Sequence, residues 1–374
     1  MSASVSRRSF LQLSAAGAAT SLAGLGLPAL ARTPAANKPL PFGVPATGDV
    51  YIGANEYPLG PCQAAQEAMA AILPYGNRYL RDLQKGVVEV FAQQEGVPAD
   101  HVVAYPGSSE PLEFATLAFA SPQASLVTAD PSYENPWRTA GRIGAQIHRV
   151  PLREDYSHDV RAMCAADPKA GMLYICSPNN PTGTVTPRRD IEYALANKPA
   201  GSVLVVDEAY IHFSEERSAI DLVGTGEDVV VLRTFSKLYG MAGIRLGFAV
   251  ARPQLLARMK HFFSANYVPV TAAAAGIASM QDPEVVPQRR GENRRVLKAT
   301  VDWLTARGHA CSASDSNCFL VEVGRPAAEF SAAMAELGVH VGRNWPIWPT
   351  RPRISVGTAE EMARFRQAFA RVMG

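Results

Sequence analysis

The sequence has few of the residues from which disulfide frameworks and metal centres are built. Its 374 residues include five cysteines and seven histidines. The odd number of cysteines, with no C-x-x-C spacing, excludes the disulfide framework of a small secreted domain. No two histidines stand at the spacing of metal ligands, so we expect no metal site.

Several catalytic signatures are missing as well. No G-x-G-x-x-G opens a predicted helix, which argues against a dinucleotide site. Neither G-x-S-x-G nor H-E-x-x-H occurs, which argues against hydrolases of the nucleophile-elbow type and against zinc proteases.

The sequence also lacks an excess of charge of either sign. Its 36 basic and 34 acidic residues give a formal net charge of +2, so nothing indicates a nucleic-acid partner. One basic run falls at helical spacing among polar residues and is predicted to be a solvated helix face. It consists of Arg289, Arg290, Arg294, Arg295 and Lys298.

The first 31 residues differ in composition from the rest. Arg7 and Arg8 precede a weakly apolar stretch over residues 10–30 that is rich in Ala, Gly and Leu. Residues 29–31 offer the small side chains that a signal peptidase reads. The segment resembles a twin-arginine export signal, which implies transient contact with that export machinery, cleavage after Ala31 and a periplasmic protein. The alternative is an uncleaved membrane anchor, because the stretch is about long enough to span a bilayer.

From residue 102 onward, short β-branched runs alternate with longer amphipathic stretches such as 110–120 and 188–196. This alternation predicts an α/β fold with a mainly parallel sheet covered by helices on both faces. Sheets of this kind bind ligands at the carboxyl ends of their strands. The predicted strands are residues 101–105, 125–128, 146–150, 172–176, 202–206, 229–232 and 246–250.

After about residue 265 the pattern becomes that of a smaller α+β domain. A periodic stretch over 283–307 predicts a long helix, strands follow at 318–323 and 353–356, and a helix over 359–373 closes the chain. We therefore divide the chain into a signal at 1–31, an N-terminal segment at 32–75 that packs on the small domain, a large domain at 76–265 and the small domain at 266–374.

A lysine follows one of the buried strands. Lys237 ends TFSK, directly after the apolar run VVVL. Burial disfavours the ammonium form and lowers the pKa of the side chain, which frees the amine to attack a carbonyl group. Arg245 follows eight residues later and is placed to return to the same site. Taken alone, a lysine at the end of a strand is more often a surface residue at the start of a helix, and the other segments have to reverse that interpretation.

Two segments place hydroxyl groups and backbone amides just past predicted strands. PGSSEP joins a strand to a helix through Gly107, Ser108 and Ser109. Amides at a helix start, with hydroxyl groups beside them, hold a phosphate dianion. In DPSY, the ring of Tyr133 follows another strand and is placed to stack on a flat cofactor.

Two further segments carry amides and a carboxylate. SPNNPTG, over residues 177–183, is a turn with two asparagines. VVDEAY ends a strand on Asp207, with Tyr210 three residues later. An aspartate at this position pairs with a protonated ring nitrogen, although a lone strand-end aspartate also serves as a helix N-cap.

These segments together resemble the fold-type-I aminotransferases. The order PGSSE, PSY, SPNNPTG, VVDEAY, TFSKLYGMAGIRLGF and RISVGT is similar to that family, and within it to the histidinol-phosphate aminotransferase group. The resemblance runs from ANEYP, which begins at Ala54, to the final helix. It implies the type I fold of pyridoxal-5′-phosphate (PLP)-dependent transferases, PLP as cofactor, amino-acid and 2-oxo-acid substrates, and a homodimer.

The resemblance implies a role for each matching residue. Lys237 carries the cofactor as a Schiff base and moves the proton between the substrate α-carbon and the cofactor. Asp207 keeps the ring nitrogen protonated, and Asn180 and Tyr210 hydrogen-bond the phenolic oxygen. Tyr133 stacks on the ring. The phosphate is held by Ser108, Ser109, Thr234, Ser236 and Arg245.

The substrate and the partner subunit are implied to meet other residues. Arg353 resembles the arginine that pairs with a substrate carboxylate or phosphate, and Asn55 and Arg343 are further substrate-binding candidates. Tyr79, in GNRY, resembles the tyrosine that reaches the phosphate in the neighbouring subunit.

Two departures bear on the substrate. Histidinol-phosphate enzymes carry an aromatic residue ahead of the ANEYP-type segment that helps to bind the substrate phosphate, whereas here only Phe42, without a hydroxyl group, is available. Arg343 is displaced by about one residue, and Trp345 and Trp348 share its loop. Both changes favour an amino acid with an apolar or aromatic side chain.

Two alternatives stay open. A PLP-dependent lyase or decarboxylase uses the same cofactor residues, because the bond that breaks depends on which one stands perpendicular to the ring. An exported binding protein on a decayed scaffold needs no chemistry at all, but the intact set of Lys237, Asp207 and Arg245 argues against it.

Overall fold

The computed structural model describes residues 48–262 and 268–374. The expected signal over 1–31, its cleavage point and Phe42 lie outside the described residues. Among the residues that are described, no helix is both long and apolar enough to cross a membrane.

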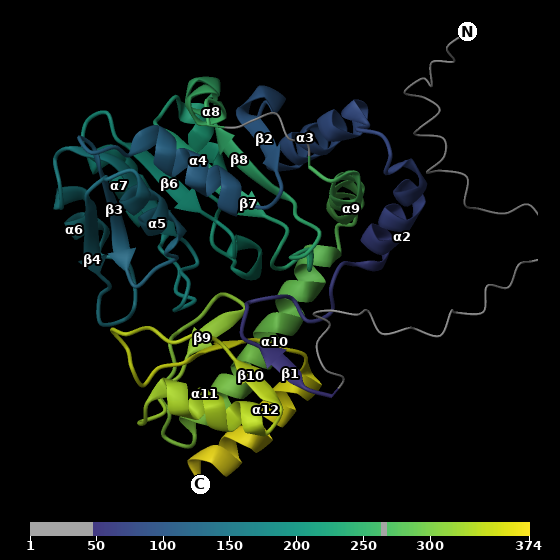
Figure 1. Cartoon of the computed structure of the whole chain (residues 1–374), viewed down its shortest axis with the longest axis vertical. Coiled ribbons are helices and arrows are strands. Elements are labelled where there is room, and N and C mark those ends of the chain that lie inside the picture. The colour runs from purple at the N-terminus through teal and green to yellow at the C-terminus, as the bar shows by residue number, and fades with distance from the viewer. Residues whose placement is uncertain (1–47, 263–267) are drawn as a thin grey trace, which may run out of the picture. The chain divides into compact units, whose positions relative to one another are not determined.

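A seven-stranded sheet forms the centre of the large domain (Figure 1). Its strand order is β2-β8-β7-β6-β5-β3-β4, and every strand is parallel to its neighbours except β8, which is antiparallel to both. All seven strands predicted from the sequence are present, and the α/β class is confirmed. The strands are β2 (Val102–Tyr105), β3 (Ser125–Asp130), β4 (Ile147–Pro151), β5 (Ala170–Cys176), β6 (Val203–Asp207), β7 (Val229–Thr234) and β8 (Gly247–Ala251).

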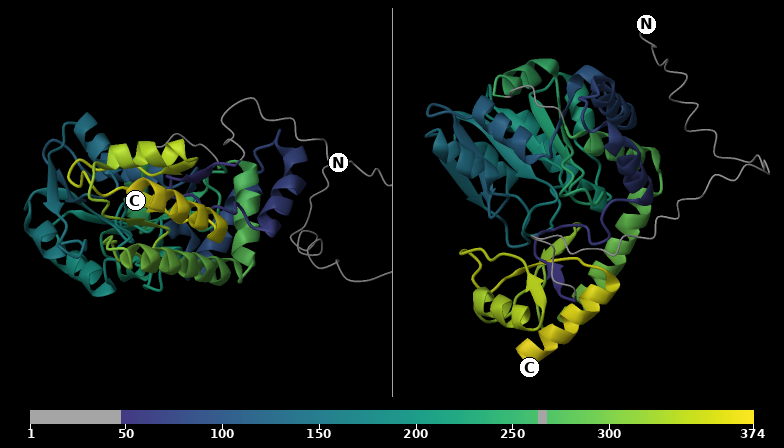
Figure 2. Two further views of the ribbon diagram at one scale, coloured as in Figure 1. Left: turned by 90° about the horizontal axis from the view of Figure 1, so that it is seen from below. Right: turned by 45° about the vertical axis from the view of Figure 1, so that its right-hand side comes forward.

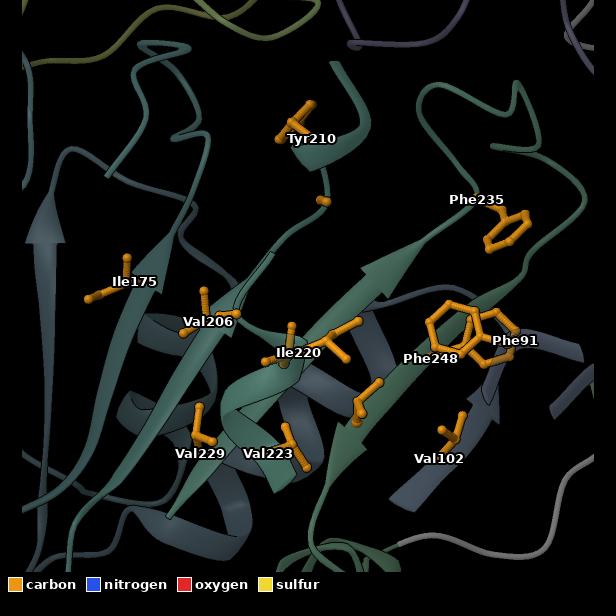
Figure 3. Packing of buried hydrophobic residues seen from close by; sticks show 14 of the residues in the cluster. Phe91, Val102, Ile175, Val206, Tyr210, Ile220, Val223, Val229, Phe235 and Phe248 are labelled. Atoms are coloured by element: carbon orange, nitrogen blue, oxygen red, sulfur yellow. The ribbon is translucent and has the colours of Figure 1, made fainter. Parts of the chain in front are cut away.

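Neighbouring residues of a strand point to opposite faces of the sheet. Because the strands consist mostly of apolar residues, both faces are apolar, and both are buried. On one face, Val206 and Ile175 belong to a core with Phe91 and Phe248. Figure 3 shows these side chains, with Tyr210 beyond the end of β6. The helical elements of the large domain are α2 (Gln63–Ile72), η1 (Leu73–Tyr75), α3 (Arg81–Glu95), η2 (Ala99–His101), α4 (Ser109–Phe119), α5 (Asn135–Arg142), α6 (Val160–Ala165), α7 (Arg188–Asn197), η3 (Ile211–Phe213), η4 (Ile220–Thr225), α8 (Pro253–Lys260) and α9 (Val270–Gln281).

The small domain has its own core and two short strand pairs. Strand β1 (Val50–Ile52) pairs in parallel with β10 (Val339–Val341), and β9 (Cys318–Leu320) pairs antiparallel with β11 (Arg353–Ser355). The pairing of β1 places the start of the described chain on the small domain, as expected for the segment 32–75. For the end of that segment the expectation is wrong, because α2 packs against α9 and contributes Ala65 to the core of the large sheet. The helices are α10 (Val285–Thr305), α11 (Ala327–Glu336) and α12 (Ala359–Met373), and the left view of Figure 2 shows α10 and α12 side by side.

The boundary between the domains differs from the prediction. Helix α9 packs against α2 and α3, and its alanines belong to the core of the large sheet. Helix α10 contributes Val285 to that core and Val296 to the small-domain core. The small domain therefore begins within α10 and not at residue 266. The reason is the composition of α9, whose small side chains permit close approach: a Cβ on Gly276 would lie 2.2 Å from the Leu246 side chain.

The basic run on α10 is only partly a solvated face. Arg294, Arg295 and Lys298 are exposed, as predicted. Arg289 and Arg290 are half-buried and donate hydrogen bonds to the carbonyl groups of Leu238 and His212, over 2.9 and 2.8 Å. For these two residues the prediction is wrong, because α10 packs against the segments that follow β6 and β7.

Candidate active site

Lys237 lies three residues beyond the end of β7, at the carboxyl edge of the sheet. Its Nζ atom lies 3.4 Å from the carbonyl oxygen of Ala54 and 5.5 Å from the centre of the Tyr210 ring. Burial lowers the pKa of Lys237 to about 8, and the guanidinium group of Arg353 acts in the same direction. About one tenth of the side chain is therefore a neutral amine at pH 7, far more than for an ordinary lysine, and this is the form that attacks a carbonyl carbon.

Asp207 is the last residue of β6 and is fully buried. Its Oδ2 accepts a hydrogen bond from the Tyr174 hydroxyl at 2.9 Å, and its Oδ1 accepts one from the Ala209 amide at 3.1 Å. Burial raises the pKa of Asp207 to about 6, although both hydrogen bonds and the charge of Lys237 favour the ionised form. A buried carboxylate with this support is suited to pair with a protonated ring nitrogen.

Tyr210 and Asn55 come from different parts of the chain and meet at this edge. The Asn55 side-chain amide donates to the Tyr210 hydroxyl oxygen at 3.1 Å. Ser355 holds Asn55 at both ends: its hydroxyl accepts from the Asn55 backbone amide and donates to the Asn55 side-chain oxygen, each over 2.8 Å. Because its oxygen accepts from Asn55, the Tyr210 hydroxyl proton is directed elsewhere. No role for Ser355 was expected from the sequence.

The residues predicted to hold a phosphate converge on Arg245. Its Nη1 donates to the Ser236 hydroxyl at 3.1 Å, and Thr234 donates to that same oxygen at 2.9 Å. Its Nη2 donates to the Pro106 carbonyl at 3.1 Å, and a Cβ on Gly107 would lie only 2.1 Å from this nitrogen. Only glycine fits at 107, where φ is also +90°.

Helix α4 begins beside this group. Ser108 occupies the N-cap position and Ser109 the first helical position, and the Ser108 side chain makes no capping bond. The first turn of the helix therefore presents its backbone amides and the Ser108 hydroxyl group close to Gly107, which lies against the Arg245 guanidinium. This donor set has the charge and geometry for a phosphate dianion.

Arg353, from β11, lies on the other side of the predicted cofactor residues. It is buried, its Nη1 donates to Asn180 Oδ1 at 2.7 Å, and its Nη2 donates to the Gly53 carbonyl at 2.6 Å. Within residues 48–262 and 268–374, its Nε has no hydrogen-bond partner although it is buried. A buried guanidinium with an unused donor fits an anionic ligand group.

Arg343 is paired with an acidic side chain instead. It forms an ion pair with Glu134 at 2.6 Å and is about half exposed. Its guanidinium also lies 4.8 Å from the ring centre of Trp345, a buried side chain over which Arg353 lies at 5.6 Å. Of the two arginines predicted to bind substrate, the structure therefore places only Arg353 with the catalytic residues. Trp348 is not buried and meets the Tyr156 ring edge-on.

Two tyrosines complete the predicted set. Tyr133 follows β3, is half-buried, and packs on the same core cluster as Tyr174. Tyr79 lies between η1 and α3 and is 74 % exposed. That exposure is what a residue reaching a second subunit requires. The described part of the chain contains no cluster of metal-ligating side chains, so the expectation of no metal site meets no contrary observation there.

The site as a whole fits PLP. It combines phosphate donors around Arg245, a buried carboxylate at Asp207 and an amine of lowered pKa at Lys237. The buried Nε of Arg353 remains for a substrate anion. These are the groups that a phosphorylated, electron-withdrawing aldehyde cofactor and an amino-acid substrate need.

Comparison with known proteins identifies the family. Residues 48–369 match aminotransferase class I and II. A histidinol-phosphate aminotransferase of Symbiobacterium thermophilum is 36 % identical over 87 % of this chain and 91 % of its own length. An aromatic amino acid aminotransferase of Rhodococcus jostii is 32 % identical over 86 % of this chain and 90 % of its own length.

Solved structures agree with this family. A structure from Erwinia carotovora atroseptica superposes with a TM-score of 0.84 at 30 % identity, covering 88 % of this chain and 98 % of that one. Histidinol-phosphate aminotransferase from Sinorhizobium meliloti, solved in complex with PLP, has a TM-score of 0.79 over 87 % and 90 % of the two chains; at 22 % identity it shows the fold alone. These findings favour transamination over the lyase or decarboxylase alternative. The chain belongs to the class I and II aminotransferases and, as a member of that family, is a PLP-dependent transaminase.

Proposed function

We propose that this aminotransferase takes the amino group from an amino acid with an aromatic or other apolar side chain and passes it to a 2-oxo acid. The observation that carries the proposal is the Arg343–Glu134 ion pair, which neutralises the second arginine near the substrate end. Arg353 then remains to bind the α-carboxylate, and the Trp345 ring lies against it as an apolar surface.

The cofactor residues act as follows. PLP, when bound, supplies an electron sink for the bond that breaks at the substrate α-carbon. With PLP bound, Lys237 Nζ would hold the cofactor and, as a free amine, would move the proton between the substrate α-carbon and the cofactor; a pKa of about 8 suits a general base near neutral pH. Asp207 would keep the ring nitrogen protonated, Tyr210 would donate to the phenolic oxygen, and Tyr133 would stack on the ring.

The residues expected to bind the substrate combine a buried positive charge with fixed hydrogen-bond partners. A planar guanidinium offers two parallel donors to the two oxygens of a carboxylate, so Arg353 both binds and orients the substrate. Asn180 and Gly53 fix the guanidinium from behind. Asn55, held by Ser355, positions Tyr210 beside the bound substrate.

Histidinol phosphate is the second candidate substrate. Curated relatives at up to 36 % identity carry that name, whereas one at 32 % is an aromatic amino acid aminotransferase. A substrate phosphate would require a cation beyond Arg353, and Arg343 would have to leave Glu134 to supply it. The deciding experiment compares kcat/KM for phenylalanine, tyrosine, leucine and histidinol phosphate with one common 2-oxo acid. A clear preference for histidinol phosphate overturns the proposal.

The proposal includes a homodimer in which Tyr79 reaches the phosphate of the partner subunit. Its support is the exposure of Tyr79 together with that of Leu73 and Tyr75, which precede it closely in the sequence. Sedimentation should give twice the mass of one chain. Tyr79→Phe should weaken cofactor retention without changing that mass, and a monomeric, fully active enzyme contradicts the assignment.

The proposal also includes export to the periplasm by the twin-arginine route, on the strength of Arg7 and Arg8. Replacing both arginines with lysine should leave a folded, cofactor-loaded protein in the cytoplasm, because that route carries folded proteins and depends on the arginine pair. Fractionation of cells decides it. Undiminished arrival of the double-lysine variant in the periplasm refutes this part.

A further inference from the structure

Tyr174 lies within β5 on the side of the sheet where Asp207 ends β6. The two strands are parallel, with Tyr174 opposite Val205 and Cys176 opposite Asp207. Because alternate residues share a face, the side chains of Tyr174, Cys176 and Asp207 lie on one face. The Tyr174 ring therefore extends along the sheet, and its hydroxyl reaches Asp207 Oδ2 at 2.9 Å.

The Tyr174 hydroxyl and the Asp207 carboxylate are both buried, so their hydrogen bond is shielded from solvent. Tyr174 is 0 % and Asp207 2 % exposed. Burial raises the pKa of Tyr174 far above its usual value, with the Asp207 charge adding to the effect, so the hydroxyl stays protonated and donates at every working pH. The direction of the bond is thus fixed: tyrosine donates and aspartate accepts.

The remaining ionisable groups near Asp207 do not replace this donor. Lys237 favours the ionised carboxylate through its charge. Burial raises the pKa of Cys176 well above its usual range, so it stays a neutral thiol. Tyr133 packs on the same core cluster as Tyr174, and the donors to the carboxylate within the described residues are Tyr174 and the Ala209 amide, not Tyr133. The second donor to Asp207, the Ala209 amide, occupies the other oxygen.

We infer that Tyr174 is a positioning residue that keeps Asp207 ionised and oriented, and thereby sets the lower pH limit at which the enzyme retains its cofactor. This inference rests on the proposed role of Asp207 toward the ring nitrogen. Removing the hydroxyl group takes one donor from a buried carboxylate. The protonated form of Asp207 then persists to higher pH, and a neutral carboxyl group no longer balances a protonated ring nitrogen.

The test is Tyr174→Phe, which keeps the ring and removes only the hydroxyl group. The dissociation constant of PLP from apoenzyme is measured between pH 5 and pH 9 by the cofactor absorbance. In the wild type, affinity should fall as the pH drops through about 6. In the variant the midpoint should rise by about one pH unit, so that affinity falls ~10-fold at pH 5 and about 2-fold at pH 7, while the two enzymes agree at pH 9.

Tyr105→Phe is the matched control, because Tyr105 is also fully buried and belongs to the same core cluster. It should leave the midpoint where it is. A midpoint that stays in place in Tyr174→Phe, or a loss of affinity that is equal at every pH, overturns the inference. If Tyr174→Phe does not fold, 3-fluorotyrosine at position 174 keeps the size, strengthens the donor and must lower the midpoint.

Asp207→Asn separates this inference from the proposed function. If Asp207→Asn leaves cofactor affinity unchanged, the role of Asp207 itself fails. If Asp207→Asn weakens binding and Tyr174→Phe does not, only the inference fails. If Tyr174 acts through Asp207, adding Tyr174→Phe to Asp207→Asn should change affinity less than ~2-fold.

Discussion

Arg353 and Asn180 are 173 positions apart in the sequence and share a hydrogen bond of 2.7 Å from Nη1 to Oδ1. Arg353 belongs to a small-domain strand and Asn180 to the turn after β5 of the large domain. The bond therefore joins the group proposed to bind the substrate to a residue assigned to the cofactor. A change at either residue should affect orientation of the substrate relative to the cofactor ring.

Arg353→Lys should lower kcat/KM for amino acids at least ~30-fold while the cofactor absorbance band remains. Lysine offers a single ammonium group and cannot bind a carboxylate through two parallel donors. Losing one partner of a desolvated charge pair costs on the order of 2–5 kcal/mol. Arg343→Lys is the control and should change kcat/KM less than ~3-fold, since Arg343 is bound to Glu134. Equal effects of the two variants would contradict the assignment of Arg353.

Lys237→Ala should abolish turnover and leave a folded protein. The side chain carries the amine that holds the cofactor and moves the proton, and no other lysine is described at this edge of the sheet among residues 48–262 and 268–374. Borohydride treatment followed by peptide mapping should label Lys237 in the wild type and no residue in the variant. A Lys237→Ala protein that is colourless yet fully active would sink the proposed mechanism.

The apoenzyme should be more stable without the Lys237 charge. The folded-state pKa is about 8 and the ordinary value is 10.5. Protonation thus favours the unfolded chain: the destabilisation is complete below about pH 8 and vanishes as the pH rises toward 10.5. Lys237→Met should raise the free energy of unfolding of the apoenzyme at pH 7 by on the order of 2–3 kcal/mol, with a smaller gain at pH 10.

Urea denaturation of cofactor-free protein at pH 7, 8.5 and 10 measures this gain. Substituting the exposed Lys169 with Met is the control and should change stability little at any pH. A gain that is independent of pH would show that packing, and not charge, is responsible.

Gly107→Ala should weaken cofactor binding without unfolding the sheet. A Cβ at this position would lie 2.1 Å from Arg245 Nη2, so the guanidinium must move away from the phosphate position. We expect the dissociation constant of PLP to rise ~10-fold or more. Gly201→Ala is the matched control, since its φ is +78° but open space surrounds it. It should share the backbone strain and leave cofactor affinity unchanged; equal losses in both variants would refute the steric argument.

The strands of the large domain were predictable because each is a β-branched or apolar run bounded by polar residues. Tyr174 was not, because a tyrosine in an apolar strand is typical of the core, and its partner lies 33 positions away on the next strand. The domain boundary was predicted wrongly at α9, because an alanine-rich helix does not indicate by its sequence which of the two cores it packs against. The three-residue strands β1 and β10 pair across the length of the chain and have no local signal.

The substrate residues were the hardest to place from sequence. The position of Arg343 next to a loop with two tryptophans indicated a change in specificity. The direction of that change in specificity depends on Glu134, which lies beyond β3 and more than two hundred positions away from Arg343. Sequence spacing contains no information about such an ion pair, whereas the structure gives its length as 2.6 Å.

Glu134→Gln should broaden specificity toward anionic substrates. Glu134 holds Arg343 outside the substrate-binding set, while Arg343 and Arg353 lie over the same Trp345 ring. Once the carboxylate is removed, Arg343 is free to meet a second anionic group on the substrate. The ion pair is partly exposed and worth at most about 1 kcal/mol, so the gain should be modest. We expect kcat/KM for glutamate or histidinol phosphate, relative to phenylalanine, to rise ~3–5-fold.

Arg138→Gln provides the control for this experiment. Arg138 binds the other oxygen of Glu134 at 3.3 Å, so its loss perturbs Glu134 without releasing Arg343. The ratio of kcat/KM values should then stay as in the wild type. Arg343→Met should cancel the effect of Glu134→Gln in the double variant and leave phenylalanine turnover nearly unchanged, because Arg343 does not touch an apolar substrate. If Arg343→Met alone lowers phenylalanine turnover ~10-fold or more, Arg343 already binds the α-carboxylate, and the assignment of that role to Arg353 alone is wrong.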